Sequence, residues 1–180
     1  MSSDSGATTT DLPVDIRSFR TSDLPACRVL YKEGLLGGKL AENDTGLDID
    51  DIEFAYMKTD GNHFWVAETI PTGAKEKPSI VGMIGVQHHD EGAAEIRRLR
   101  VSNDVRRRGV GSKLIETALH WCHDHNYLKV TLDTFMEREP AIKLFEKFHF
   151  KHSRTREVNG KELLYFYLDI YGREEQRQRG

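Results

Sequence analysis

The stretch Val101-Ser-Asn-Asp-Val-Arg-Arg-Arg-Gly-Val-Gly-Ser112 forms a basic turn with two glycines, between an expected strand and a long expected helix. The first N–H groups of a helix have no partner within it and lie at the positive end of its dipole, where phosphate oxygens bind. Glycine lets a ligand approach the backbone closely, and arginine adds positive charge. The predicted phosphate-binding residues are Arg106, Arg107, Arg108, Gly109, Val110, Gly111, Ser112 and Lys113.

Other phosphate-binding loops fit this turn poorly. A P-loop has four residues between its glycines and then Lys and Ser or Thr, and a dinucleotide fingerprint has a third glycine after an early strand. Here a single residue separates Gly109 from Gly111. The competing interpretation is an ordinary solvated turn at the start of a helix. The flanking sequence has to decide between the two.

Apolar periodicity on both sides of the turn predicts the fold. Helical spacing predicts helices that begin at 21–23, cover 48–57 and 109–125, and begin again at Pro140. Alternating runs predict strands at 14–19, 63–67, 79–86, 94–101, 129–133, 150–156 and 162–170. This order predicts one α/β (α+β) domain over 13–171, with a mixed, mostly antiparallel sheet of about seven strands and helices on both faces. We expect residues 1–12 to form a disordered tail and residues 172–180 a charged tail.

Composition excludes several classes of function. The 180 residues carry a net charge of −3, which gives no general attraction to nucleic acid or acidic lipid. No apolar run approaches the roughly 18 residues that cross a bilayer, and no leader pattern precedes the first strand. Cys27 and Cys122 suit a reduced cytoplasm better than a disulfide. His88 and His89 have no third spaced ligand, so we expect no metal site.

The flanks of the turn resemble a known family. The strand Ala94-Glu-Ile-Arg-Arg-Leu-Arg-Val101, the Arg-x-x-Gly-x-Gly turn and the following helix resemble the signature of the GNAT superfamily of N-acetyltransferases. Leu132-Asp-Thr134 and Ala141-x-x-Leu-Phe-x-x-x-x-Phe150 resemble its second conserved block. The resemblance covers about residues 14–170 and implies that the two central strands splay apart.

This resemblance implies a donor and a reaction. The donor is acetyl-CoA, used as a co-substrate without a metal, and an amine attacks its thioester directly. The pantetheine arm would bond to the main chain of Leu99, Arg100 and Val101, and the pyrophosphate would lie on residues 106–112. The expected acceptor is a primary amine of a small molecule or amino-acid derivative. Alternatives are a protein lysine or N-terminal acetyltransferase, a non-catalytic acyl-CoA sensor, and a nucleic-acid-binding module; a homodimer is compatible with the sequence.

Glu95 is the candidate catalytic base. It lies fourteen residues before Gly109, the offset at which the histone-acetylating branch of the superfamily carries its glutamate. Strand alternation puts Glu95 on one face with Arg97 and Leu99, unless a bulge changes the phase. The alternative is an exposed glutamate that pairs with a nearby arginine.

One position departs from the family pattern. Many members have a tyrosine that protonates the leaving thiolate where this chain has Phe145, which has no proton to donate. A thiol pKa around 8.5 makes the thiolate a fair leaving group, so solvent suffices at modest cost. Tyr165 and Tyr167 are substitutes to consider.

The acceptor site is the least determined part. The resemblance assigns it to residues 31–48 and 154–162. Arg97, Arg98 and Arg100 are unusual on a central strand, where charges need partners. They would either bind an acceptor carboxylate or form ion pairs with Glu68, Glu91 or Glu95, and the second is favoured.

Overall fold

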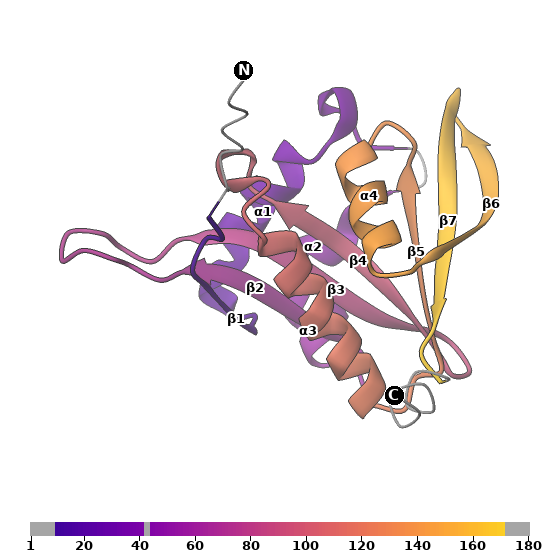
Figure 1. The fold of residues 1–180 in the computed structure, drawn as a ribbon, viewed down its shortest axis with the longest axis horizontal. Coiled ribbons are helices and arrows are strands. Elements are labelled where there is room, and N and C mark those ends of the chain that lie inside the picture. Colours follow the sequence, from indigo (N-terminus) through magenta and orange to yellow (C-terminus); the bar gives the residue numbers. More distant parts are fainter. Residues whose placement is uncertain (1–9, 42–43, 172–180) are drawn as a thin grey trace, which may run out of the picture.

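The computed structural model describes residues 10–41 and 44–171, which form one seven-stranded sheet in the order β1-β2-β3-β4-β5-β7-β6 (Figure 1). All neighbouring strands are antiparallel except β4 and β5, which run parallel. The strands are β1 (Val14–Ser18), β2 (His63–Thr69), β3 (Ile80–Asp90), β4 (Ala93–Val101), β5 (Lys129–Phe135), β6 (Lys151–Val158) and β7 (Lys161–Asp169). The predicted mixed sheet of seven strands is confirmed.

Helices cover both faces of the sheet, as Figure 1 shows. On one face lie α3 (Val110–Asp124) and α4 (Glu139–Lys147), and on the other lie α1 (Leu24–Glu33) and α2 (Leu47–Asp50). Within the described ranges, no helix is both long enough and apolar enough to cross a bilayer. The two faces of the sheet have separate hydrophobic cores, one under α3 and α4 and the other under α1 and α2.

The helix expected at 48–57 is interrupted. Asp51 leaves the helical region (φ −141°, ψ 76°), so α2 ends at Asp50 and a π-helical turn follows at Glu53–Met57. The side chain of Asp51 accepts a hydrogen bond from the N–H of Phe54 at 3.0 Å, as a capping residue does at the start of a new turn. Local capping thus ends the continuous helix that the apolar spacing predicted.

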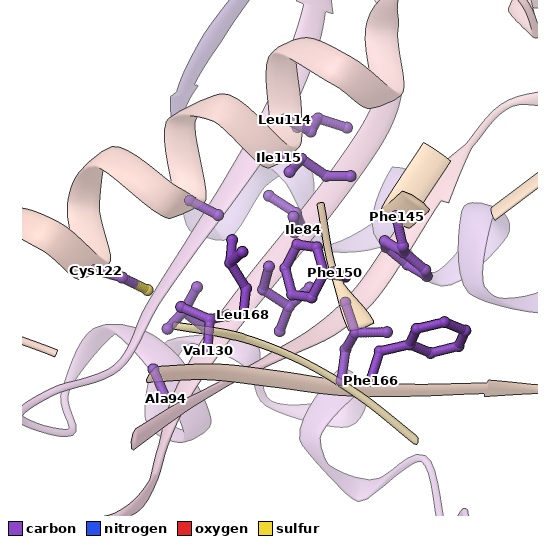
Figure 2. Packing of buried hydrophobic residues seen from close by; sticks show 14 of the residues in the cluster. Ile84, Ala94, Leu114, Ile115, Cys122, Val130, Phe145, Phe150, Phe166 and Leu168 are labelled. Atoms are coloured by element: carbon purple, nitrogen blue, oxygen red, sulfur yellow. The ribbon is translucent and has the colours of Figure 1, made fainter. Parts of the chain in front are cut away.

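The larger core lies between α3 and the sheet (Figure 2). Leu114 and Ile115 are fully buried on the helix face that was predicted to pack inward. Gly82 of β3 permits this contact, because a Cβ there would lie 2.9 Å from Leu114 Cδ1. The start of α3 is consequently held firmly on the sheet.

Both cysteines are free and buried, as expected for a reduced protein. Cys27 packs in the core beneath α1, and Cys122 packs in the core beneath α3. Burial raises the pKa of each thiol to about 12. Neither side chain has the ionisable, accessible character of a catalytic nucleophile.

The pairing of β4 with β5 is short and leaves the sheet open. It joins Ala93 to Lys129, Ala94 to Val130 and Glu95 to Thr131, and then stops. Beyond Glu95 the two strands diverge, with β5 continuing along β7 (Figure 1). The predicted separation of the central strands is confirmed, and it opens a gap beside the end of β4.

Candidate active site

The turn before α3 has the geometry of an anion-binding helix start. Gly109 caps the helix in the left-handed region (φ 81°), which favours glycine. The first backbone hydrogen bond of the helix runs from Lys113 N–H to Gly109 O at 3.2 Å. The N–H groups of Val110, Gly111 and Ser112 therefore lie at the open, positive end of α3.

The two glycines also meet packing demands within the protein. A Cβ on Gly109 would lie 2.9 Å from a carboxylate oxygen of Asp11, and a Cβ on Gly111 would lie 2.9 Å from Leu144 Cδ2. From the sequence, both glycines are expected to allow the close approach of a ligand to the backbone. The structure adds that Gly111 lets α4 pack against the start of α3.

Residues just before β1 contact the turn. Leu12 N–H donates to Arg108 O at 2.9 Å, while Arg108 Nε donates to Thr10 O and Lys113 Nζ to Leu12 O, both at 3.3 Å. Residues 1–9 of the expected tail, and residues 172–180, lie outside the described ranges. Arg106 and Arg107 are exposed and form no ion pair among the described residues. These two arginines remain available to an anion.

A bulge in β4 reverses the phase of the strand. Met83 faces Arg100 and Gly85 faces Arg97, so Arg98 and Leu99 together oppose Ile84 alone. Arg98 has φ 57°, in the left-handed region. Leu99 therefore packs with the core under α3 and does not share a face with Glu95, because the bulge, the exception allowed for in the sequence analysis, shifts the alternation by one residue.

Arg98 is buried and pairs with two aspartates from the segment around α2. Its Nη1 and Nη2 donate to the two oxygens of Asp44 at 2.6 and 2.8 Å, and its Nε donates to Asp48 at 2.9 Å. Tyr31 and Tyr56 donate hydroxyl hydrogen bonds to Asp44 and Asp48, respectively. The expected partners of Arg98 were Glu68, Glu91 and Glu95, and for Arg98 that expectation is wrong.

The charge of Arg98 decides how these aspartates ionise. Burial alone would raise the pKa of Asp44, but the hydrogen bonds and charge of Arg98 outweigh it and lower the pKa to about 2. Burial also raises the pKa of Asp48, but the hydrogen bonds from Arg98 and Tyr56 outweigh this effect and lower the pKa. The left-handed backbone of Arg98 costs about 1 to 3 kcal/mol, which these ion pairs must offset.

Glu95 lines a cavity of about 450 Å³ where β4 and β5 begin to part. Its Oε2 lies 3.2 Å from His89 Nδ1, and its Oε1 lies 3.9 Å from Arg97 Nε. Only 24% of the side chain is exposed, so Glu95 is neither buried nor fully solvated. Glu95 thus contacts an arginine, as the ion-pair interpretation expects, and it also faces the cavity, where a catalytic base would have to lie.

Aromatic residues divide between this cavity and the core. Tyr165 and Tyr167 line the cavity, and the Arg154 guanidinium stacks on the Tyr165 ring at 4.1 Å. Phe145 instead packs in the core with Phe150 and Phe166 (Figure 2). Its phenyl ring stabilises the attachment of α4 to the sheet.

Asp133 is a cavity residue that the sequence analysis did not single out. Its side chain is exposed at the cavity, and it has no hydrogen-bond or ion-pair partner among the described residues. Surrounding protein atoms remove water from its carboxylate and Glu95 adds repulsion, and both effects raise its pKa. Thr131 is the strand partner of Glu95, and Asp133 lies two residues further along β5. Strand alternation therefore places Asp133 on the same face of the sheet as Glu95.

Known proteins share this sequence pattern and fold. Residues 30–150 match the model of the Acetyltransferase (GNAT) family. Human N-acetyltransferase 8 is 33% identical over 58% of this chain and 45% of its own length, and human N-acetylaspartate synthetase is 34% identical over 58% of this chain and 33% of its own. The chain therefore spans less than half the length of these curated relatives.

The fold has close structural counterparts as well. A GNAT-family acetyltransferase from Staphylococcus aureus Mu50 superposes with a TM-score of 0.71, covering 87% of this chain and 99% of that protein. The two sequences are 18% identical, so this likeness concerns the fold alone.

Removing Arg98 should destabilise the protein in a pH-dependent way. In Arg98→Met, Asp44 and Asp48 would face each other without a cation, which we expect to cost about 3 to 5 kcal/mol at pH 7. In the wild type, Asp44 contributes to folding stability above its unfolded pKa near 3.9, and this contribution is lost as the pH falls toward 2. The variant instead gains folding stability as the pH falls, because its unpaired aspartates become protonated. Denaturant unfolding of both proteins from pH 7 to 3 should show the difference shrinking.

Arg97→Met is the matched control, because Arg97 contacts Gln87 and Glu95 at the cavity and no buried aspartate pair. A wild-type-to-variant difference that is the same at every pH would contradict this account of Arg98.

Asp133→Asn should stabilise the protein at pH 7. Because the pKa of Asp133 is raised in the folded state, its ionised carboxylate disfavours folding above that pKa, and this cost is lost as pH falls through it. The melting temperature of the variant should exceed that of the wild type at pH 7 and match it at about pH 3.5. The exposed Asp15→Asn should show no such gain, and a lower melting temperature for Asp133→Asn at pH 7 would refute the repulsion.

Proposed function

This chain belongs to the Acetyltransferase (GNAT) family, and from that premise we propose that it is an acetyl-CoA-dependent N-acetyltransferase. Its proposed acceptor is a primary amine of a small molecule or an amino-acid derivative. The observation that carries the proposal is the open start of α3 beside the unpaired edge of β4, next to a cavity with two carboxylates.

The residues present fit coenzyme A. The N–H groups of Val110–Ser112 and the uncompensated charges of Arg106 and Arg107 suit a diphosphate. The main chain of Leu99–Val101 has no partner on β5, so it is free to hydrogen-bond an extended pantetheine arm. Bound there, acetyl-CoA would supply an activated thioester at the cavity.

The cavity residues supply what the amine needs. An alkyl ammonium has a pKa near 10.4, so a base must take its proton before nitrogen can attack. Glu95 accepts that proton, directly or through water, and Asp133 adds the negative charge that favours a cationic acceptor. A backbone N–H near the bulge donates to the carbonyl oxygen as charge develops on it.

The reaction balances without an acyl-enzyme. The amine nitrogen forms a bond to the acetyl carbon, the carbon–sulfur bond breaks, and the thiolate leaves with the electron pair. Phe145 has no proton to give and lies in the core, so the thiolate takes its proton from solvent or from Tyr165 or Tyr167, which line the cavity. The name of one relative, N-acetylaspartate synthetase, supports an amino-acid acceptor.

Turnover should be visible as thiol release. With acetyl-CoA, the wild type should release coenzyme A in the presence of some members of a panel of amines, amino acids and peptides. Glu95→Gln should lower kcat by about 100-fold or more, because general base catalysis contributes about that much, with little change in coenzyme A affinity.

The exposed Glu116→Gln is the control and should keep wild-type activity. Binding of coenzyme A without thiol release for any amine would contradict the enzymatic proposal and favour an acyl-CoA sensor.

A further inference from the structure

Two arginines converge at the end of α1. Arg138, which follows β5, donates a short hydrogen bond from Nη2 to the carbonyl oxygen of Gly34. Arg100, on β4, packs so closely against the same residue that a Cβ on Gly34 would lie 2.2 Å from Arg100 Nε and 2.5 Å from Cδ. Both guanidinium groups therefore meet at Gly34, although Arg100 lies on β4 and Arg138 lies between β5 and α4, on the other side of the gap.

Neither of these guanidinium groups has a carboxylate partner among residues 10–41 and 44–171. Arg100 Nη1 donates to Leu99 O at 2.9 Å, and its Nε is buried without any hydrogen-bond partner. The contrast with other enclosed arginines is clear. Arg98 binds Asp44 and Asp48, and Arg17, whose Nε is also unpaired, binds Asp23 and Glu68 through its terminal nitrogens.

An enclosed pair of cations without an anion is unfavourable. Burial lowers the pKa of Arg100 to about 10, and the charges of Arg138 and Arg98 contribute. Burial and the charge of Arg106 also lower the pKa of Arg138. A pKa of about 10 keeps Arg100 protonated at neutral pH, so the pair is complementary to a bound anion.

The position of the pair indicates which anion. Leu99 and Val101 face the core under α3, whereas Arg100 faces α1 on the other side of the sheet. Glu95 faces the cavity earlier on the same strand. An anion between Arg100 and Arg138 would thus lie on the α1 side of β4, beside Gly34 in the segment 31–48 that the family resemblance assigns to the acceptor.

We infer that Arg100 and Arg138 bind the carboxylate of the acceptor, which makes the acceptor a free amino acid or another amine that carries a carboxylate. This inference rests on the proposed function. Two guanidinium groups offer several parallel N–H donors to the two carboxylate oxygens, a stronger and more directional contact than a neutral amide makes. Glycine at position 34 leaves room for Arg100, because a Cβ there would displace the Arg100 side chain.

The test compares free L-amino acids with their α-carboxamides as acceptors, for example L-aspartate, L-alanine and L-phenylalanine. In the wild type, kcat/KM should favour the free acid at least about tenfold, chiefly through KM. In Arg100→Gln and Arg138→Gln this preference should fall to near unity, while turnover of the amides is retained. Arg28→Gln, at an arginine of α1 whose side chain donates to the Asp50 carbonyl oxygen and has no ion-pair partner among the described residues, should keep the wild-type preference.

Gly34→Ala gives an independent variant that retains both charges. Gly34 has ordinary helical dihedral angles (φ −81°, ψ −2°), so alanine adds no backbone strain and acts only by displacing Arg100. We expect the same loss of preference for free acids, with a melting temperature close to that of the wild type.

Calorimetry distinguishes a failure of this inference from a failure of the proposed acetyltransferase function. Free amino acids should bind to the protein saturated with coenzyme A and bind at least tenfold more weakly to Arg100→Gln, even if no turnover is found. Equal kcat/KM for acids and amides in the wild type would overturn the inference and leave the acetyltransferase proposal standing. Loss of coenzyme A affinity in Arg100→Gln or Arg138→Gln, with the acid preference unchanged, would also overturn it, because the pair would then bind a donor phosphate.

Discussion

The short parallel pairing of β4 with β5 is the constraint on which the rest of the site depends. It ends at Glu95 and Thr131, so the following backbone of β4 has no neighbour on that side. The sheet tolerates this opening because α3 and α4 cover one face and α1 covers the other, which holds both strands without direct hydrogen bonds between them. The gap therefore exists before any ligand arrives, and Glu95 and Asp133 face the cavity at its closed end.

The bulge at Arg98 decides which side chains at the end of β4 face α3 and which face α1. Leu99 and Val101 are directed to the core under α3, while Arg98 and Arg100 are directed to α1 and the segment around α2. A regular strand would have placed Leu99 on the same face as Glu95, away from the core under α3. One left-handed residue, held by two aspartates, thus separates the side chains of β4 that face α3 from those that face α1.

The sequence predicted local features well and distant ones poorly. The start of α3 and its buried face follow from glycine positions and helical spacing, which depend on neighbours in the chain. Asp44 and Asp48 pair with Arg98 across 54 and 50 residues, and no local pattern connects them. The bulge likewise leaves no mark in composition, because arginine is not a residue that favours a positive φ. Asp133 was within reach of strand alternation once Glu95 had been paired with Thr131.

Amide chemical shifts during a titration with coenzyme A would show whether the gap and the start of α3 together form the donor site. We expect the largest perturbations at the N–H groups of Val110–Ser112 and at Leu99–Val101, on the two sides of one bound molecule. Saturable binding of coenzyme A that leaves both groups of amides unperturbed would contradict this expectation.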